Sequence, residues 1–236
     1  MSNGGAKGGS TRAPVPDQLY HTTLTVVDYH ADTSGATRSV YVLGTHTTLE
    51  SAKEFSLKAL SQLGYERDDF ETYASRAEVQ DPDAWTHGDG VLVYTKAPAG
   101  QEFYVGIDTT PNNASLSADA ATHEPLLPKG IDHLQYVMQN QTDYNRDRSG
   151  AAQSSEIEGC YVHRADAINA AKRLLKTEMD DFAQYDERRD VAQAKTDWPF
   201  GDDVWVHAVA QTGENYNVAV RTIPSTHHKY RKAVAV

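Results

Sequence analysis

The alternation of hydrophobic and polar residues predicts four strands in the first half of the chain. Residues 20–29 alternate leucine and valine with threonine, which is the period-two pattern of a strand with one buried face. Residues 39–44, SVYVLG, form a second run of β-branched and aromatic residues. Two further alternating runs, 91–95 and 103–109, flank a short segment that contains proline and glycine. These two runs therefore predict a β-hairpin.

A helical periodicity separates the second run from the third. Thr47 and Glu50 have the spacing of a capping box, in which each side chain accepts a hydrogen bond from a free backbone N–H of the first turn. Gly64 follows the last apolar position and is suited to end the helix. The apolar stripe of this predicted helix consists of Leu49, Ala52, Phe55, Ala59, Leu60 and Leu63.

A short second helix is predicted to begin at the Asp-Asp-Phe segment of residues 68–70 and to carry Phe70 and Tyr73 inward. The same three residues recur at 180–182. Acidic residues at a helix start interact favourably with the helix dipole, which gives these carboxylate pairs a structural role. A catalytic acid would instead need a buried carboxyl group with a raised pKa.

The whole pattern occurs twice along the chain. Residues 85–111 and 198–224 align without a gap at a shift of 113 positions. The identical pairs include Trp85/Trp198, Gly88/Gly201, Asp89/Asp202, Val91/Val204, Val93/Val206, Gly100/Gly213, Val105/Val218, Thr109/Thr222 and Pro111/Pro224. Two shorter matches precede this one, 28–36 with 143–151 and 68–73 with 180–185. We therefore interpret the chain as a tandem duplication of one module.

The second module follows the same order with a shorter helical region. Cys160-Tyr161-Val162 takes the place of the strand residues 41–43, and Asp166 is the expected N-cap of the helix. Its apolar stripe consists of Ile168, Ala171, Leu174, Leu175 and Met179. Each module thus reads as a β-β-α-β-β unit of the α+β class, with an antiparallel sheet and its helix on one face. We expect the same strand order in both copies, and the copies packed together as a pseudo-dimer.

Composition divides the chain into five segments. They are a flexible Gly-rich arm (1–16), module 1 (17–111), a linker (112–129), module 2 (130–224) and a basic tail (225–236) with Lys229, Arg231 and Lys232. A self-assembly hypothesis places an edge strand in the tail.

Comparison of the two copies predicts which face of each sheet is buried. Positions 91, 93, 103, 105, 107 and 109 stay apolar or threonine in both copies and are expected in the core. The alternate positions diverge: Tyr94/His207, Lys96/Val209, Tyr104/Asn217 and Asp108/Arg221. Leu92 and Trp205 are expected on this second face as well. Large rings on an open sheet face indicate a contact, which we expect to be between the modules rather than with an external ligand.

Charge and composition restrict the partners. The net charge of −11 repels phosphate backbones, so nucleic-acid binding is not expected. No stretch has the length and hydrophobicity of a membrane span, and the N-terminus lacks the apolar core of a signal peptide. Cys160 is the single cysteine. These features predict an intracellular, cytoplasmic protein.

The Trp-x-x-Gly-Asp motif is the most distinctive candidate site, because both copies carry it. It contributes Trp85, His87 and Asp89 in one copy and Trp198 and Asp202 in the other. The candidate binding surface is completed by Tyr94, Tyr104, Trp205 and His207. Phe200 replaces His87 in the second copy, so the only good proton-transfer group of the motif is lost there. This loss favours an architectural role for the motif.

No cofactor and no metal site is expected. His30-x-Asp32 and Cys160-x-x-His163 each offer two ligands, but neither has a second pair at zinc-like spacing. Cys160 lies in an apolar strand, where a thiol is inert. Two functional hypotheses follow. The first is a non-enzymatic scaffold that binds a partner protein or itself. The alternative is a cofactor-free small-molecule-binding protein or enzyme with a cavity between the two sheets, lined by the divergent aromatic and histidine positions.

Overall fold

The computed structural model of the protein describes residues 15–189 and 197–223, so most of the N-terminal arm and the whole basic tail, with its expected edge strand, lie outside the described residues. Module 1 contains β1 (Gln18–Asp28), β2 (Arg38–His46), α1 (Leu49–Gln62), β3 (Thr72–Ser75), β4 (Val91–Lys96) and β5 (Gln101–Pro111). Module 2 contains β6 (Gln135–Asp143), β7 (Gln153–Tyr161), α2 (Arg164–Leu174), β8 (Phe182–Glu187), β9 (Val204–Ala210) and β10 (Glu214–Arg221).

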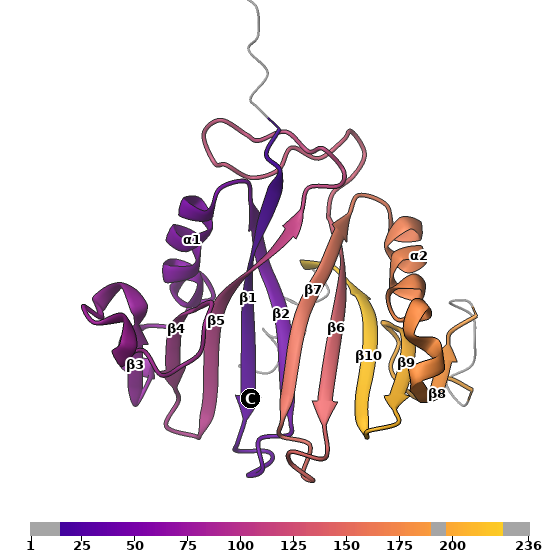
Figure 1. The fold of residues 1–236 in the computed structure, drawn as a ribbon. Helices are drawn as coiled ribbons and strands as arrows, with labels where there is room; N and C mark the ends of the chain where they lie inside the picture. The colour runs from indigo at the N-terminus through magenta and orange to yellow at the C-terminus, as the bar shows by residue number, and fades with distance from the viewer. Residues whose placement is uncertain (1–14, 190–196, 224–236) are drawn as a thin grey trace, which may run out of the picture.

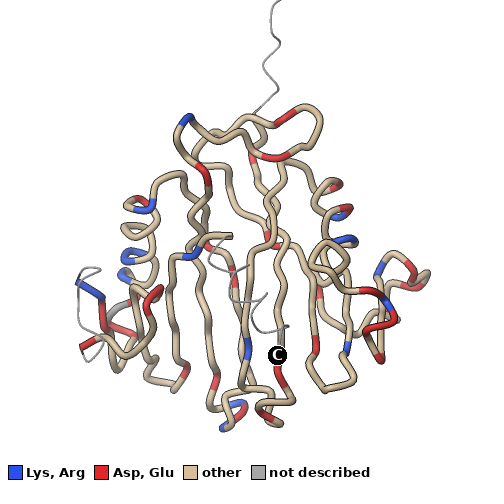
Figure 2. Tube along the Cα trace, turned by 180° about the vertical axis from the view of Figure 1, so that it is seen from behind, with Lys and Arg blue, Asp and Glu red and all other residues tan. Residues whose placement is uncertain are grey.

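The two modules have the same topology, as the duplication predicts. The strand order is β2-β1-β5-β4-β3 in one five-stranded antiparallel sheet and β7-β6-β10-β9-β8 in the other. Figure 1 shows the two sheets side by side, with α1 and α2 on the outer sides of the molecule. In the rear view of Figure 2, charged residues gather along the helices and the connecting loops, while most of the central strand length is uncharged. The α+β class and the two similar modules are therefore confirmed.

Each module has one strand more than expected. The predicted second helix of module 1 is wrong, because only a single 3-10 turn, Arg67–Asp69, precedes the edge strand β3. Phe70 and Tyr73 still pack against the core under α1. In module 2 the acidic pair ends the 3-10 segment Lys176–Asp181, directly before β8. The Asp-Asp-Phe segments thus lead into edge strands rather than helices.

The helix caps differ from the predicted ones by one to three residues. Thr48, not Thr47, caps α1, and its Oγ1 accepts a hydrogen bond from the backbone N–H of Ser51. Thr47 Oγ1 donates to the carbonyl of His123 instead. In α2 the N-cap residue is His163, and Asp166 lies within the first turn.

The end of α1 follows the prediction. Gly64 has a φ of +92°, and the N–H of Tyr65 donates to the carbonyl of Leu60, which is the Schellman arrangement. Ala52, Ala59 and Leu60 of the predicted stripe are buried, and Phe55 and Leu63 are partly buried against the same core. Leu49 is an exception, because its side chain is 42% exposed. In and directly after α2, Ala171 and Leu175 are buried, and Ile168 and Leu174 pack against the core. The side chain of Met179 is not among those that the structure describes.

The strand registers show which residues of the two modules correspond. Thr22 pairs with Gly44 and Val137 pairs with Gly159, and a bulge follows at the same place in both sheets. The shift from β1 through the helix is therefore constant at 115, as in the match of 28–36 with 143–151. Cys160 consequently corresponds to Thr45, and its predicted alignment with residue 41 is wrong.

The helix-facing side of each sheet carries the core that the two copies predict. Val93, Phe103 and Val105 are buried under α1. Val206 and Val218 are buried under α2. At the start of β4 and toward the end of β5 the prediction is only partly correct, since Val91 and Ile107 are half-buried and Thr109 is exposed.

A β-bulge overturns the expected position of Leu92 and Trp205. Both residues lie at a register shift, between Val91 and Val93 in β4 and opposite the Val218–Ala219 step in β9. A bulge breaks the alternation of side chains, so both side chains turn toward the helix. Leu92 packs against the core under α1, and Trp205 is only 2% exposed in the core under α2.

The non-helical faces of the two sheets form a common core. This shared cluster contains Leu19, Val42, Leu116, Leu134, Tyr136, Met138, Ile157 and Cys160. Leu116 comes from the segment expected to be a linker, where the side-chain amide of Asn112 donates to the carbonyl of Leu116. The connecting segment is therefore packed against the modules it joins.

The contacts between modules are reciprocal. Arg38 donates from Nη2 to the carbonyl of Ala151 at 2.7 Å, and Gln153 donates from Nε2 to the carbonyl of Ala36 at 2.8 Å. Each pair of equivalent positions, Arg38 with Gln153 and Ala36 with Ala151, differs by the same 115 residues. Reciprocal contacts of this kind define a two-fold axis. The two copies are thus packed as a pseudo-dimer, as expected.

Candidate functional site

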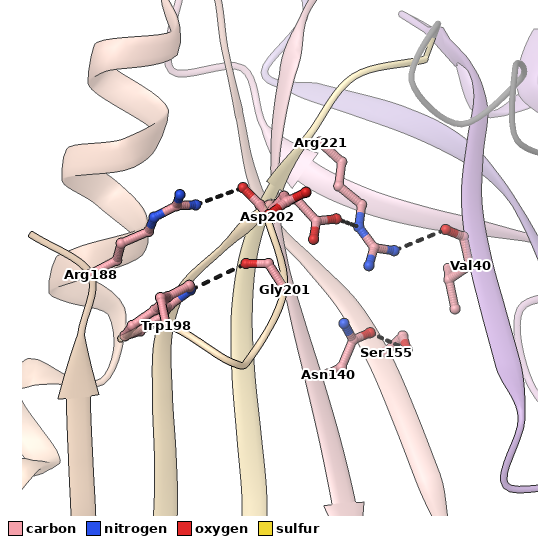
Figure 3. A network of polar contacts seen from close by, with 9 residues as sticks. Val40, Asn140, Ser155, Arg188, Trp198, Gly201, Asp202 and Arg221 are labelled. Atoms are coloured by element: carbon pink, nitrogen blue, oxygen red, sulfur yellow. Dashed lines mark hydrogen bonds and ion pairs between the residues drawn. The ribbon is translucent and has the colours of Figure 1, made fainter. Parts of the chain in front are cut away.

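In both modules the indole of the Trp-x-x-Gly-Asp motif holds its own loop. Trp85 Nε1 donates to the carbonyl of Gly88 at 3.1 Å. Trp198 Nε1 donates to the carbonyl of Gly201 at 3.2 Å (Figure 3) and to that of Val204 at 3.0 Å. The shared glycines adopt a positive φ, +104° at Gly88 and +122° at Gly201, which explains why this position is glycine in both copies. The shared residues of the motif therefore act in building the loop.

A ladder of rings links each motif to the adjacent strand. In module 1 the His87 ring stacks on Tyr94, with centroids 4.0 Å apart and an angle of 10° between the planes. In module 2 Phe200 stacks on His207 at 3.9 Å and 12°. The histidine and the aromatic residue have exchanged places, but the stack is the same. Each ladder thus contains one histidine ring, at a different position of the same stack.

These stacks cover the divergent face of β4 and β9. Tyr94 and His207 are each only 9% exposed because of this cover. Tyr104 donates from its hydroxyl group to Glu102 Oε2 at 2.6 Å, and His207 Nδ1 donates to Asn217 Oδ1 at 2.8 Å. Burial, assisted by the charge of Glu102, raises the pKa of Tyr94 to about 12. The expected contact of Tyr94 and His207 with the other module is therefore wrong, since their own loops cover them.

The nine candidate residues do not form one site. Trp85, His87, Tyr94 and Tyr104 form a chain of ring contacts in module 1. Trp198 and His207 contact each other through Phe200 in module 2. Trp205 is buried under α2, and Asp89 and Asp202 are exposed at their loops. Arg188 Nη1 donates to the backbone carbonyl of Asp202 at 2.7 Å (Figure 3). These residues therefore lie in separate clusters, one of ring contacts in each module and Trp205 under α2.

Two open grooves lie between the modules instead, at equivalent positions about the pseudo-two-fold axis. The first, which we call the arginine groove, has a volume of about 260 Å³ and includes Arg38, Asn140, Thr142, Asp203, Asn217 and Arg221 in its lining. The second, the acidic groove, has a volume of about 330 Å³ and includes Thr23, Thr25, Asp89, Asp108, Met138 and Glu156. Arg221 in the first groove corresponds to Asp108 in the second. The two grooves therefore share a geometry but differ in charge.

The backbone of the facing edge strand explains the opposite charges at 108 and 221. Arg221 Nη1 donates to the carbonyl of Val40 in β2 at 3.1 Å, while its Nε contacts Asp203 Oδ2 at 2.7 Å (Figure 3). Asp108 Oδ2 accepts the backbone N–H of Ile157 in β7 at 2.6 Å. β2 and β7 are sheet edges, whose unpaired backbone groups need partners. A carbonyl requires a donor and an N–H requires an acceptor, so the two copies need side chains of opposite sign.

The acidic groove also affects a neighbouring carboxyl group. Burial first, and then the charges of Glu156 and Asp108, raise the pKa of Glu158.

A buried polar network lies at the centre of the pseudo-dimer. His21 is fully buried; its Nδ1 lies 2.9 Å from Thr45 Oγ1, and its Nε2 lies 2.8 Å from Thr110 Oγ1. Thr45 Oγ1 also lies 2.8 Å from the hydroxyl group of Tyr136, and Thr110 Oγ1 lies 3.8 Å from Cys160 Sγ. Every one of these polar groups has a partner, so burial costs little.

Burial shifts the pKa of each titratable group in this network toward its neutral form. It lowers the pKa of His21 to about 3 and raises that of the Cys160 thiol to about 11. Burial also raises the pKa of Tyr136. At neutral pH all three groups are therefore uncharged, and Cys160 is a thiol rather than a nucleophilic thiolate.

Sequence reasoning missed the residues that join the modules. His21, Arg38, Tyr136 and Gln153 were not candidates, although the match of 28–36 with 143–151 already contained the shift of 115. Extended along the strands, that shift pairs His21 with Tyr136 and Arg38 with Gln153. The signal that could have found these residues is the presence of different large polar residues at equivalent strand positions of the two copies.

No group of three or more histidine, cysteine, aspartate or glutamate side chains converges within residues 15–189 and 197–223. None of the helices in that part of the chain is long and apolar enough to cross a membrane. Comparison of the chain with protein-family models, with curated proteins and with solved structures finds no match.

Proposed function

We propose that the chain is a non-enzymatic interaction or scaffold protein, in which the duplicated modules form one rigid body that binds a partner protein or a second copy of itself. The observation that supports this proposal is the use of the inner sheet faces. They are occupied by the shared core and the reciprocal contacts, so each module directs its helix and its outer strands away from the other (Figure 1). Two equivalent outer surfaces on one rigid support are suited to holding partners.

This function is tested by native mass spectrometry of the full chain purified from its own host after mild cross-linking. We expect species heavier than the 26.0 kDa chain, with cross-links from the partner to lysines on the outer helices, such as Lys53 or Lys172. A chain that appears only at 26.0 kDa, with a retained small molecule, would contradict the scaffold proposal and favour the alternative.

The alternative, binding of a small molecule, is favoured by one observation in the arginine groove. Three N–H groups of Arg38 donate to the carbonyls of Gly35, Ala151 and Gln153. A guanidinium group has five N–H donors, so two remain. No carboxylate within the described residues forms an ion pair with Arg38, and the adjacent Asn140 and Thr142 add neutral polar groups. The groove is therefore suited to a small anion such as a carboxylate.

Calorimetric titration with succinate tests this second candidate. We expect binding in the millimolar range that is weakened at least fivefold in Asn140→Leu, because that side chain lines the groove and leaves Arg38 in place. The matched control is Thr25→Leu at the equivalent position in the acidic groove, which should leave succinate binding unchanged. Equal affinity in all three proteins would exclude the arginine groove as the site.

A further inference from the structure

The side chain at the bulge of β4 is smaller than the side chain at the equivalent bulge of β9. Leu92 in module 1 corresponds to Trp205 in module 2, and both side chains turn toward the helix. In module 1 a cavity of about 270 Å³ opens at this position. Its lining consists of Lys53, Leu57, Arg76, Ala77 and Leu92. We call this cavity the aromatic socket.

Module 2 shows which group occupies the equivalent position. The Trp205 indole is 2% exposed there, with Lys172 Nζ 5.5 Å and Arg188 Cζ 5.4 Å from the centre of its ring. Cations at this distance from an aromatic ring attract its π-electron face. The second module thus places a ring between a lysine and an arginine.

The correspondence of the two sites is fixed by the surrounding elements. Thr48 and His163 are the N-cap residues of α1 and α2, so Leu57 corresponds to Lys172. The matching segments 68–73 and 180–185 precede Arg76 and Arg188 by the same number of residues. The arginine is therefore common to both modules, whereas module 1 has leucine at the positions of the ring and of the lysine.

In module 1 the second cation of the site comes from another position on the helix α1. Lys53 lies one turn before Leu57 on α1 and lines the socket together with Arg76. Within the described residues, neither cation forms an ion pair with a carboxylate. Leu57 is 37% exposed, although an apolar side chain of this size is usually buried. The socket thus combines apolar walls, two cations at its rim and a missing ring.

We propose that the aromatic socket docks an aromatic side chain of a partner protein that is flanked by aspartate or glutamate. The ring would occupy the position that Trp205 fills in module 2, and the flanking carboxylates would pair with Lys53 and Arg76. The basic tail of this chain has the wrong charge for the site, since Tyr230 lies between Lys229 and Arg231. Residues 1–14 contain no aromatic residue. This inference rests on the proposed function, because it names the partner chemistry of one outer surface.

The test uses the full chain and the peptide Asp-Trp-Glu-Glu carrying a 5-fluorotryptophan, followed by fluorine NMR. We expect saturable line broadening with a dissociation constant near the millimolar range. The variant Leu92→Trp should abolish the broadening by filling the socket, and should raise the melting temperature. The variant Trp85→Phe, at a half-buried position outside the socket, serves as the matched control.

A charge reversal keeps the test decisive if Leu92→Trp folds poorly. Arg76 lies on a short 3-10 turn at the surface, where substitution leaves the core intact. Arg76→Glu should weaken the acidic peptide by at least tenfold and strengthen the matched peptide Lys-Trp-Lys-Lys. Absence of binding to the wild-type chain at 5 mM peptide (about fivefold above the expected constant for a single weak anchor), or equal binding to Leu92→Trp, would overturn the proposal.

The two proposals fail separately. If the peptide does not bind but native mass spectrometry still detects a partner protein, the socket inference falls and the scaffold function stands. If the peptide binds in the socket but the host protein carries no partner, the scaffold function falls and the socket is a site for an aromatic anion of another kind.

Discussion

At the scale of single residues, the centre of the molecule shows what a duplication permits. In a symmetric dimer, equivalent residues near the axis face identical copies of themselves. Here the equivalent positions carry different residues: His21 faces Tyr136, and Thr45 stands where the second copy has Cys160. The rings of His21 and Tyr136 lie edge to face with centroids 5.5 Å apart. Covalent linkage has let the two halves of one contact become complementary.

Burial of His21 makes the stability of the protein dependent on pH. The folded-state pKa of about 3 lies below the usual value of 6.5, so the unfolded chain binds a proton that the folded chain excludes. The stabilising contribution is therefore complete above pH 6.5 and is lost as the pH falls toward 3. We expect His21→Gln to remove up to about 1.4 kcal/mol per pH unit of this slope. Urea unfolding between pH 7 and 5 measures it.

The exposed His30→Gln variant is the control for this experiment. It leaves the buried network intact and should therefore keep the contribution of His21 to the slope. A slope that is the same in His21→Gln as in the wild type would show that His21 is not buried as a neutral ring.

The two motif tryptophans should differ in their contribution to stability. Trp198 is 5% exposed and donates to two carbonyls, whereas Trp85 is more exposed and donates to one. Replacing either indole with Phe removes the N–H donor and leaves the carbonyls without it. We expect Trp198→Phe to cost about 1–3 kcal/mol and Trp85→Phe less than about 1 kcal/mol. Equal costs in urea unfolding would contradict the difference in burial.

At the scale of elements, periodicity predicted most strands, both helices and the duplication, because each depends on local spacing. The bulge at Leu92 and Trp205 could not be read from alternation, since the extra residue puts two consecutive side chains on the same face of the sheet. The helix expected at residues 68–70 failed for a different reason. Acidic residues also suit a 3-10 turn, and only pairing with β4 makes residues 72–75 a strand.

The candidate site was predicted less well than the fold. The contacts inside each ring ladder join residues close in sequence, and the shared motif indicated them. The grooves and the aromatic socket instead depend on how β2, β7 and α1 meet other elements in space. That information is absent from a pattern of spacing.

The cap of α1 offers a direct test at this scale. Thr48 Oγ1 accepts the N–H of Ser51, so Thr48→Ala should cost about 1 kcal/mol of stability. The capping box expected from the sequence would instead make Glu50 the important residue. We expect Glu50→Ala to cost only a few tenths of a kcal/mol, through the helix dipole alone. A larger cost at Glu50 than at Thr48 in thermal unfolding would restore the capping box.

At the scale of the whole molecule, side chains of each module satisfy backbone groups of the other. Arg38 is the clearest case, with two hydrogen bonds to carbonyls of module 2. Arg38→Met should therefore cost about 1–3 kcal/mol, because a charged donor is lost from partly buried carbonyls. Arg67 is the matched control, since its exposed pair with Glu78 stays within module 1. Arg67→Met should cost much less than Arg38→Met, because solvent screens an exposed ion pair.

The proposed scaffold function depends on the two modules forming one rigid pseudo-dimer, and hydrogen exchange of the full chain at increasing urea tests this most directly. If the modules are one cooperative unit, amides of β5 and β10 will lose protection with the same free energy of opening. Arg38→Met will then lower both values equally. Loss of protection in one sheet while the other remains closed would show that the modules fold independently and would contradict a rigid pseudo-dimer.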